Sequence, residues 1–227
     1  MFEDRQDAGR QLASALLRFK DQQLCVLALP RGGVPVAFEI AKALQAPLDL
    51  VIVRKIGAPG QPELAIGAVV DGEKPELVLN HGIIRMLEIT DAYLAEEKAR
   101  QMREIERRRQ AYLAGRPRLE VSGRTAIIVD DGIATGATVT AALHATRRAG
   151  PGRLVLAVPV APTDTLAALQ GEADEVVCLE AYDFFPAISV FYGNFTQVND
   201  EEVRDLLTRA AQLLPAASGP TPEPRRA

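Results

Sequence analysis

One segment of the chain combines residue types and spacing that could hold a phosphorylated sugar: VDDGIATGATVT, residues 129–140. It follows an apolar run and leads into a helical pattern. Glycines let the backbone approach an anion closely, and the first amide groups of a new helix can donate hydrogen bonds to it. Thr135 and Thr138 could add hydroxyl donors. The adjacent carboxylates of Asp130 and Asp131, exposed at the strand end, would repel a phosphate but could accept hydrogen bonds from ribose hydroxyls.

Two other phosphate-binding motifs do not fit this segment. A Walker A loop has a lysine before its final hydroxyl residue, whereas Ala137 precedes Thr138 here. The GxGxxG spacing is absent as well. A glycine-rich turn with a capping aspartate would explain the glycines alone. It would not explain two acids followed by Thr-Gly-x-Thr between an apolar strand and a helix.

The segment resembles the phosphoribosyl diphosphate (PRPP) binding motif of the type I phosphoribosyltransferases. The resemblance implies that Asp130 and Asp131 hold the ribose hydroxyls and serve a metal, directly or through those hydroxyls or water. It also implies that residues 133–138 wrap the 5-phosphate. The PRPP-binding turn would then comprise Gly132, Ile133, Ala134, Thr135, Gly136, Ala137 and Thr138.

A second loop supports this resemblance. Residues 29–35 (LPRGGVP) follow a strand pattern and open a helical one. They are similar to the family's first loop, which binds pyrophosphate through backbone amides and often contains a non-proline cis peptide. Arg31, Gly32 and Gly33 would then face the diphosphate. A surface arginine in a turn is the alternative for Arg31.

A third segment, VRKIG at residues 53–57, ends the next predicted strand. Lys55, with Arg54 beside it, is similar to basic residues that reach pyrophosphate, in some members from the partner subunit. The resemblance thus assigns catalysis to Arg31, Lys55, Asp130 and Asp131, and it implies a homodimer. The resemblance covers nearly the whole chain except the tail. The order of its parts also looks like that of a bacterial group of predicted phosphoribosyltransferases, and residues 184–203 fit this group well.

The implied reaction is Mg²⁺-dependent transfer of a phosphoribosyl group from PRPP to a nucleobase or another small nucleophile, with release of pyrophosphate. Family members that use hypoxanthine or guanine have an acid where this chain has Ala134, which argues against 6-oxopurine salvage. Adenine, orotate and uracil users are not distinguished. Some aromatic residues could stack on a planar base or pack in the core: Phe184, Phe185, Phe191 and Tyr192. His81 and His144 are isolated, and no cluster has the spacing of a zinc site.

Apolar runs that alternate with helical patterns predict an α/β fold, a parallel sheet with helices on both faces. Ligands of such sheets bind beyond the carboxyl ends of the strands, so the loops after Leu29, Val53, Val129 and Val158 should form the site. The predicted strands are 24–29, 48–53, 64–70, 76–79, 125–129, 154–158 and 175–179, and the predicted helices are 6–20, 34–44, 136–148 and 164–169.

We expect one phosphoribosyltransferase domain over residues 1–214, with a hood or lid at about 71–115, followed by a disordered tail at 215–227. The hood contains residues 96–109, which carry ten charges in fourteen positions. Opposite charges three or four residues apart, such as Glu96 with Arg100 and Glu104 with Arg108, favour an exposed helix. This segment is either a solvated helix or one that covers the active site or binds a partner.

The 227 residues carry a formal net charge of −4, and 48% of them are hydrophobic. This composition excludes a wholly disordered chain, and no apolar stretch is long enough to predict a membrane-spanning helix. The mild acidity argues against bulk nucleic-acid binding. The start of the chain lacks the pattern of a secretory signal, so we expect a cytoplasmic protein. Cys25 and Cys178 lie in apolar runs and are expected to be buried, inert thiols.

Two alternatives to the transferase keep the same ribose-phosphate site. One is a regulator that senses PRPP or a nucleotide and binds nucleic acid through the arginines of residues 100–109, although the interleaved glutamates weaken such binding. The other is an enzyme that hydrolyses a phosphate ester or a nucleotide.

Overall fold

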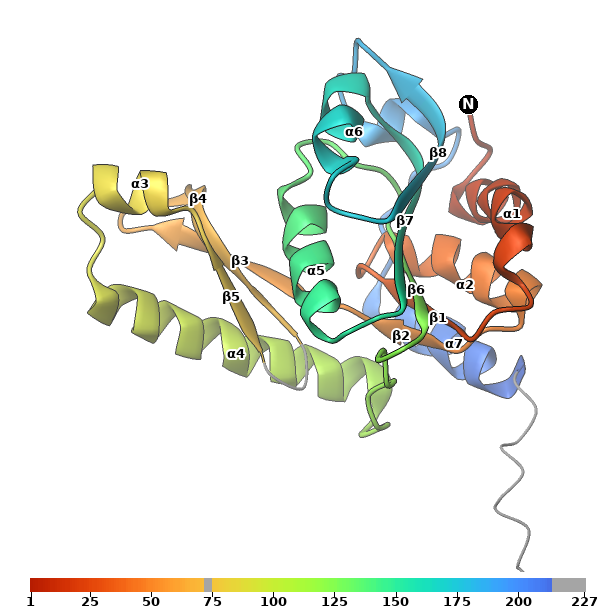
Figure 1. Cartoon of the computed structure of the whole chain (residues 1–227), viewed down its shortest axis with the longest axis horizontal. Coiled ribbons are helices and arrows are strands. Elements are labelled where there is room, and N and C mark those ends of the chain that lie inside the picture. Colours follow the sequence, from red (N-terminus) through yellow and green to blue (C-terminus); the bar gives the residue numbers. More distant parts are fainter. Residues whose placement is uncertain (72–74, 214–227) are drawn as a thin grey trace, which may run out of the picture.

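The computed structural model describes residues 1–71 and 75–213, so the tail predicted at 215–227 lies outside the described residues. A five-stranded sheet with the order β2-β1-β6-β7-β8 forms the centre of the molecule (Figure 1). Every neighbouring pair in it is parallel. The strands are β1 (Leu24–Ala28), β2 (Leu48–Leu50), β6 (Thr125–Val129), β7 (Arg153–Pro162) and β8 (Glu175–Tyr182). The predicted fold class is confirmed.

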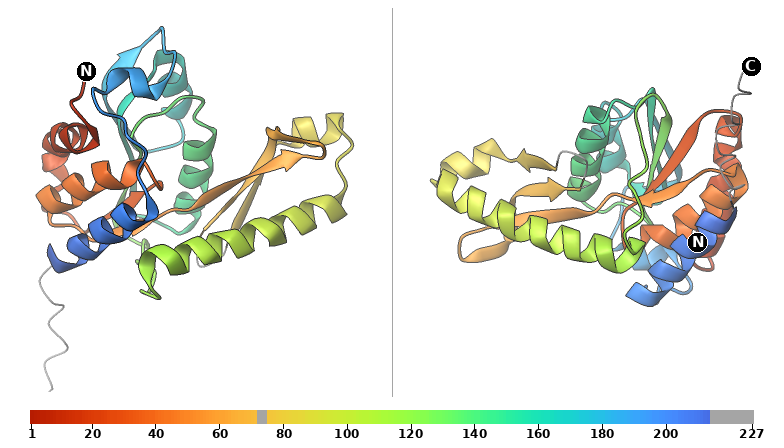
Figure 2. Two further views of the ribbon diagram at one scale, coloured as in Figure 1. Left: turned by 180° about the vertical axis from the view of Figure 1, so that it is seen from behind. Right: turned by 90° about the horizontal axis from the view of Figure 1, so that it is seen from below.

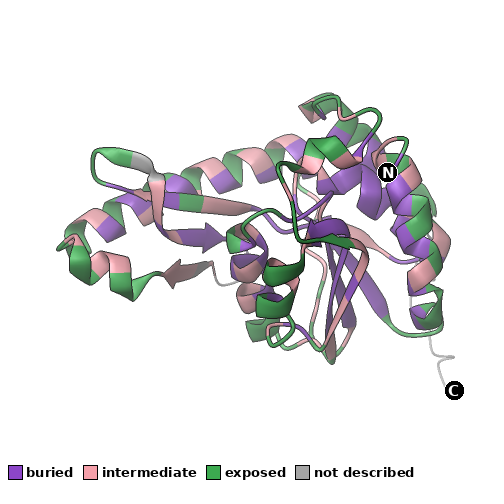
Figure 3. Ribbon diagram, turned by 90° about the horizontal axis from the view of Figure 1, so that it is seen from above, coloured by how far each residue is buried: buried purple, intermediate pink, exposed green. Residues whose placement is uncertain are grey.

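Helices cover both faces of this sheet because its strands are apolar on both sides (Figure 1, Figure 3). Val26 of β1 packs with one cluster of buried residues, whereas its neighbour Leu27 packs with the cluster on the opposite face. The first face carries α1 (Arg5–Leu16), α2 (Gly33–Leu44) and α7 (Asp200–Leu213), and the second carries α5 (Ala137–Arg148) and α6 (Thr163–Leu169). Two short 3-10 helices are η1 (Leu17–Phe19) and η2 (Ile188–Phe191). Among the described residues no helix is both long and apolar enough to cross a membrane.

Residues 53–71 and 75–113 project from the core as an arm (Figure 1, Figure 2). The arm has an antiparallel sheet with the order β3-β4-β5 and two helices. Its elements are β3 (Val53–Ala58), β4 (Gln61–Val70), β5 (Glu76–Leu79), α3 (His81–Met86) and α4 (Asp91–Leu113). The hood boundaries of 71–115 stay a prediction.

The single strand predicted at 48–53 was wrong. The core strand β2 ends at Leu50, and Val53 begins β3 by pairing with Val70 of the arm. A continuous apolar run does not reveal that its two halves pair with different sheets, because pairing partners are chosen by tertiary contacts.

Helix α4 contains the charge-rich segment and extends it at both ends. Thr90 accepts a hydrogen bond from the Tyr93 amide at 3.3 Å, and this cap starts the helix. The predicted pair of Glu104 with Arg108 is confirmed at 2.8 Å. Arg100 makes its closest ion pair with Glu97 at 2.7 Å, and the charge of Glu96 also helps to raise the pKa of Arg100.

A buried ion-pair cluster joins the arm to the core. The Arg109 guanidinium of α4 donates to Asp71 at 2.9 Å and to Asp49 of β2 at 3.2 Å. The three side chains are 8%, 1% and 9% exposed. Arg118 also pairs with Asp71, and the Leu119 amide donates to Asp49 at 2.9 Å. Because each charge is met by an opposite charge or a donor, the cluster fixes the base of the arm on the central sheet.

We predict that Arg109→Met lowers the free energy of unfolding by about 3–5 kcal/mol, because it leaves two buried carboxylates without their shared partner. Urea titration followed by circular dichroism measures this loss. The matched control is Arg107→Met on the same helix. Arg107 is 63% exposed and pairs with Glu104, so the control should leave stability almost unchanged. Equal losses for the two variants would contradict the buried link.

The two cysteines have the character expected of inert thiols. Burial raises the pKa of both thiols to about 11. Cys25 is buried in β1, whereas Cys178 of β8 is only partly buried. Both are therefore protonated at neutral pH, which makes them poor nucleophiles.

Candidate active site

The two acids of the motif directly follow β6, the middle strand of the core sheet. The Asp131 amide donates to Asp130 Oδ1 at 2.9 Å. Asp131 Oδ2 accepts a hydrogen bond from Arg5 Nε at 2.7 Å, and both side chains are only 11% exposed. The expectation of exposed acids was therefore wrong for Asp131, because Arg5 at the start of α1 covers its carboxylate. No sequence pattern marks Arg5, which precedes its partner by 126 residues.

Burial raises the pKa of both carboxyl groups. For Asp130 the neighbouring Asp131 charge adds to this rise, whereas Arg5 opposes the rise for both acids. Two adjacent carboxylates in a poorly solvated turn are thus prepared to accept hydrogen bonds from hydroxyl groups. Hydrogen bonds from bound hydroxyl groups would offset part of the free-energy cost of burying these two carboxylates.

The predicted diphosphate loop lies against this acid turn. A Cβ atom at Gly32 would lie well inside van der Waals contact of Asp131 Oδ2 and 2.6 Å from its Cγ. A Cβ atom at Gly33 would lie 2.7 Å from the Val129 carbonyl oxygen. Only glycine permits this approach, so the structure brings the two sequence motifs together. The Pro30–Arg31 peptide bond is cis.

The turn after the acids presents unpaired amide groups. Gly136 has φ of +77° and is the N-cap of α5, and no side chain caps this helix. Among the described residues, the amides of positions 134–139 donate to no other group. Helix α5 therefore begins with a cluster of free N–H donors, which is the arrangement that binds a phosphate.

Ile133 and Gly132 anchor this turn. The Ile133 side chain is buried, and its amide donates to the Val160 carbonyl at 3.0 Å. Gly132 leaves room for Ile188, whose Cγ2 would lie 2.7 Å from a Cβ atom at that position. The Thr165 hydroxyl donates to the Ala134 carbonyl at 3.0 Å. These contacts hold the ends of the turn while its exposed part stays open to a ligand.

Arg31 extends from the first loop towards α7. Its Nη1 lies 3.4 Å from Asp200 Oδ1, and the same oxygen accepts a hydrogen bond from the Tyr112 hydroxyl at 2.9 Å. The Arg31 side chain is 35% exposed. Asp200 and Tyr112 were not singled out from the sequence, because they reach the site from distant helices. The long contact to Asp200 leaves the guanidinium available to an anionic ligand.

Lys55 lies in a different part of the site from Arg31. It lines a cleft of about 400 Å³ between the arm sheet and the start of α5, together with Thr138 and His81. Small and apolar residues of β4 and β5, such as Gly67 and Val78, form much of the wall. The Lys55 backbone pairs with Ala68 of β4, but its side chain makes no ion pair or hydrogen bond within the described part of the chain. Its ammonium group can therefore serve a ligand beside the phosphate-binding turn.

The aromatic residues near the C-terminus take two roles. The Tyr192 hydroxyl donates to the Asp131 carbonyl at 2.5 Å, so this buried side chain supports the acid turn. Phe191 stacks on Phe185 with ring centroids 4.7 Å apart. Phe184 is 83% exposed. His144 is remote from this group and pairs with Glu172 at 2.6 Å.

Asp130 and Asp131 could bind a magnesium ion only together with oxygen atoms of the substrate and of water. No group of three or more His, Cys, Asp or Glu side chains in residues 1–71 and 75–213 could hold a metal. One oxygen of Asp131 is also bonded to Arg5. Mg²⁺ keeps several waters and is usually bound by one or two carboxylates with substrate phosphates. The residues present therefore suit an ion held mainly by substrate oxygens and water.

Three comparisons identify relatives of the chain. A family model described as the phosphoribosyl transferase domain matches residues 3–192. A Mycobacterium tuberculosis protein named "Putative phosphoribosyl transferase", found in two strains, is 50% identical over 210 residues, which are 92% of this chain and 47% of that protein. The chain thus spans about half the length of the curated relatives it matches.

A solved structure supports the same relationship. The crystal structure of TT1426 from Thermus thermophilus has a TM-score of 0.80 and 44% sequence identity to this chain. The match covers 92% of this chain and 98% of that one. The family model also spans the acid turn, the glycine loop and Lys55. The family predicted from the sequence is confirmed, and the chain belongs to the phosphoribosyl transferase domain family.

Proposed function

We propose that the chain catalyses Mg²⁺-dependent transfer of a phosphoribosyl group from PRPP to a nucleobase or another small nucleophile, and that it releases pyrophosphate. The observation that carries this proposal is one continuous turn, residues 130–138, in which paired carboxylates precede unpaired helix amides. The glycine loop packs against that turn. A ribose that carries a 5-phosphate and a diphosphate at C1 has hydroxyls for the carboxylates, a phosphate for the amides and a diphosphate for the glycine loop.

In this proposal the 5-phosphate accepts hydrogen bonds from the amides at positions 134–139, and the ribose hydroxyls donate to Asp130 and Asp131. The diphosphate lies on the loop of Arg31, Gly32 and Gly33. The bond between C1 and the diphosphate oxygen breaks, and the diphosphate leaves with the electron pair. A lone pair of the acceptor forms the new bond to C1. Preorganised donors stabilise the leaving group most strongly as its charge develops. Bound Mg²⁺ would supply further neutralisation of the diphosphate charge.

The acceptor is proposed to be a small planar molecule. The cleft of about 400 Å³ beside Thr138 has room for a nucleobase, and Lys55 and His81 supply polar groups at its wall. The exposed ring of Phe184 is a second surface that could stack on a base. Ala134 offers no carboxylate to take a proton from a 6-oxopurine, so adenine, orotate and uracil come first in a screen.

The charge pattern of α4 favours an enzyme over a nucleic-acid-binding regulator. Arg107 and Arg108 both pair with Glu104, and Arg100 pairs with Glu97. Arg109 is buried among acids of the core. Arginines that are already paired release few counterions when they meet phosphates, so they contribute little to nucleic-acid affinity.

The test offers the purified chain PRPP, Mg²⁺ and a panel of nucleobases, and it measures pyrophosphate release. We expect release that depends on one of the bases, with a ribonucleotide product identified by NMR. A product of water addition alone would favour the hydrolase instead. If calorimetry detects no PRPP binding at millimolar concentration, the proposal fails.

We predict that Arg31→Gln lowers kcat/KM for PRPP by about 100-fold, because it removes a charged donor to the leaving diphosphate. Steady-state assays with the identified acceptor measure the loss. The control Arg147→Gln removes an arginine that pairs with Asp174 on the surface, and it should leave the rate unchanged. Unchanged kinetics of Arg31→Gln would exclude Arg31 from diphosphate binding.

The proposal includes the cytoplasmic homodimer expected from the sequence. Sedimentation velocity on the purified chain measures its mass in solution and tests the dimer.

A further inference from the structure

Arg5 is the group outside the sequence motif that contacts the acid pair most directly. Its Nε lies 2.7 Å from Asp131 Oδ2, within charge-assisted hydrogen-bond distance. The same Oδ2 atom is the one nearest to the Cβ position of Gly32, where no side chain could be accommodated. Asp131 Oδ2 is thus next to both Arg5 and the backbone of the proposed diphosphate loop.

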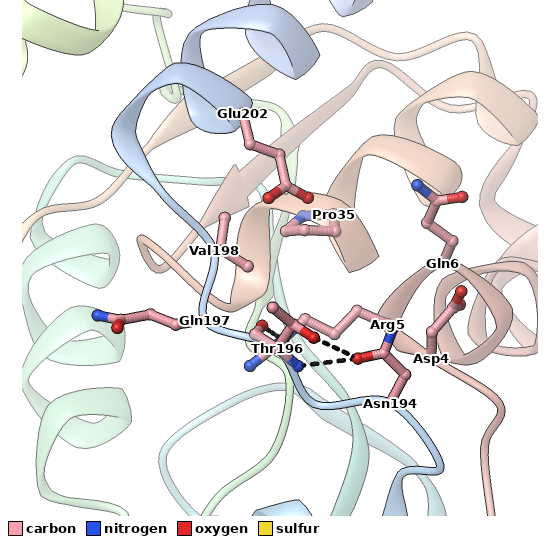
Figure 4. A pocket seen from close by; sticks show the side chains of 9 residues that line it. All are labelled: Asp4, Arg5, Gln6, Pro35, Asn194, Thr196, Gln197, Val198 and Glu202. Atoms are coloured by element: carbon pink, nitrogen blue, oxygen red, sulfur yellow. Dashed lines mark hydrogen bonds between the residues drawn. The ribbon is translucent and has the colours of Figure 1, made fainter.

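The Arg5 guanidinium is itself fixed by the C-terminal segment. Its Nη1 donates to the Thr196 carbonyl at 2.8 Å. Its central carbon lies 3.8 Å from the centroid of the Phe195 ring, in a cation–π contact. The side chain forms part of the wall of a small polar cleft of about 180 Å³, where Asn194 and Thr196 are hydrogen-bonded neighbours (Figure 4). An arginine held by three contacts loses little freedom when it binds its partner.

In the part of the chain that the structure describes, the charged or titratable groups bonded to Asp131 are Arg5 from α1, the adjacent Asp130, and Tyr192, whose hydroxyl donates to the Asp131 carbonyl. Arg5 is the cation in this set, and its charge opposes the rise in pKa that burial causes in both acids.

We propose that Arg5 is a positioning residue of the phosphoribosyl site, which orients the Asp131 carboxylate against Gly32 so that the acid pair can receive the ribose hydroxyls. This inference rests on the proposed function. Arg5 acts through Asp131 and does not itself contact the sugar. It also ties the first turn of α1 and the segment at 195–196 to the binding of PRPP.

The test compares Arg5→Gln, Arg5→Lys and the wild type. Glutamine keeps a donor but removes the charge, so we expect PRPP affinity at pH 7.5 to fall about 10- to 100-fold. Arg5→Lys should restore part of the affinity, since its ammonium group keeps the charge but cannot make all three contacts. If Arg5 acts through Asp131, then adding Arg5→Gln to an Asp131→Ala variant should lower the affinity no further.

Arg10→Gln is the matched control, because Arg10 lies on the same helix, is 53% exposed and pairs with Asp7. It should leave PRPP affinity unchanged, both alone and beside Asp131→Ala. Circular dichroism verifies that each variant folds. If Arg5→Gln fails to fold, Phe195→Leu tests the same point by loosening the guanidinium, with a smaller fall in affinity.

The outcomes separate this inference from the proposed function. A wild type that binds no PRPP overturns the proposed function and the role of Arg5 with it. A wild type that binds PRPP, beside an Arg5→Gln variant with equal affinity, overturns the role of Arg5 alone. A further loss of affinity when Arg5→Gln is added to Asp131→Ala also overturns it, because Arg5 would then not act through Asp131.

Discussion

The double variant Asp130→Asn, Asp131→Asn should bind PRPP at least about 100-fold more weakly than the wild type while it remains folded. Each carboxylate is proposed to accept a hydrogen bond from a ribose hydroxyl, and a hydrogen bond to a charged group contributes about 1.5–3 kcal/mol. Losing two of them corresponds to a factor of roughly 10²–10⁴ in affinity. Isothermal titration calorimetry with PRPP and Mg²⁺ measures this change directly.

The fold should tolerate the change because burial raises the pKa of both acids. A raised pKa means that the folded state binds a proton more tightly than the unfolded chain. This contribution to stability is complete below the pKa of the unfolded chain and is lost as the pH rises through the pKa of the folded state. Asparagine does not titrate at positions 130 and 131. As the pH rises from the pKa of the unfolded chain through the pKa of the folded state, the unfolding free energy of the double variant should therefore fall less than that of the wild type. The amide oxygen introduced at position 131 could still accept the hydrogen bond from Arg5.

Asp205→Asn is the control for this experiment, because Asp205 is 61% exposed on α7 and pairs only with Arg209. It should change neither affinity nor melting temperature. Normal PRPP binding by the double variant would mean that the assigned ribose contacts are wrong. An unfolded double variant would instead show that the charged pair stabilises the domain.

Gly32→Ala should abolish measurable PRPP binding and lower the free energy of unfolding by about 1–3 kcal/mol, as expected for overpacking. Gly32 has φ of −60° and ψ of −35°, which alanine adopts without strain. The effect is therefore steric: the new methyl group would overlap the Asp131 carboxylate, which cannot turn away without losing Arg5. A single added carbon atom would thus displace one of the two acids from the sugar and widen the diphosphate loop.

Calorimetry and thermal unfolding together test this prediction. Gly171→Ala is the matched control, since no atom lies within 4 Å of a Cβ at that position. It should behave like the wild type in both measurements. If Gly32→Ala binds PRPP with wild-type affinity, then the contact between the diphosphate loop and Asp131 has no part in recognition.

Most of the core could be predicted from the sequence because its signals are local. The strand at 125–129 was predicted at its observed bounds, and the helix predicted at 136–148 begins one residue later, after Gly136 takes a positive φ. Strands that are buried on both faces appear in the sequence as continuous apolar runs. Glycines mark the two loops of the site, the glycine loop and the acid turn, where the backbone closely approaches a ligand or the other loop. The candidate site followed from the same local patterns, since its two loops each leave a strand and open a helix.

Helix α7 was not predicted, although it supplies Asp200 to the site. Residues 200–213 were placed inside the domain without a secondary structure, and their apolar stripe packs on α2 as part of the core. The start of the arm was also predicted wrongly, because the strand predicted at 48–53 is divided between β2 of the core and β3 of the arm. The run at 48–53 contains nothing to indicate that the chain leaves one sheet and enters another.

The amino-acid sequence by itself determined the family, the parallel sheet and the residues of the acid turn and glycine loop, since each depends on neighbours in the chain. Only the tertiary structure decided that Asp131 is buried, that Arg5 is its partner and that Arg31 and Lys55 lie in different places, beside α7 and in the cleft next to α5. The physical reason is that burial and charge pairing depend on which distant segments meet. Arg5 and Asp131 are 126 positions apart in the sequence and come into contact only when α1 packs on the folded sheet.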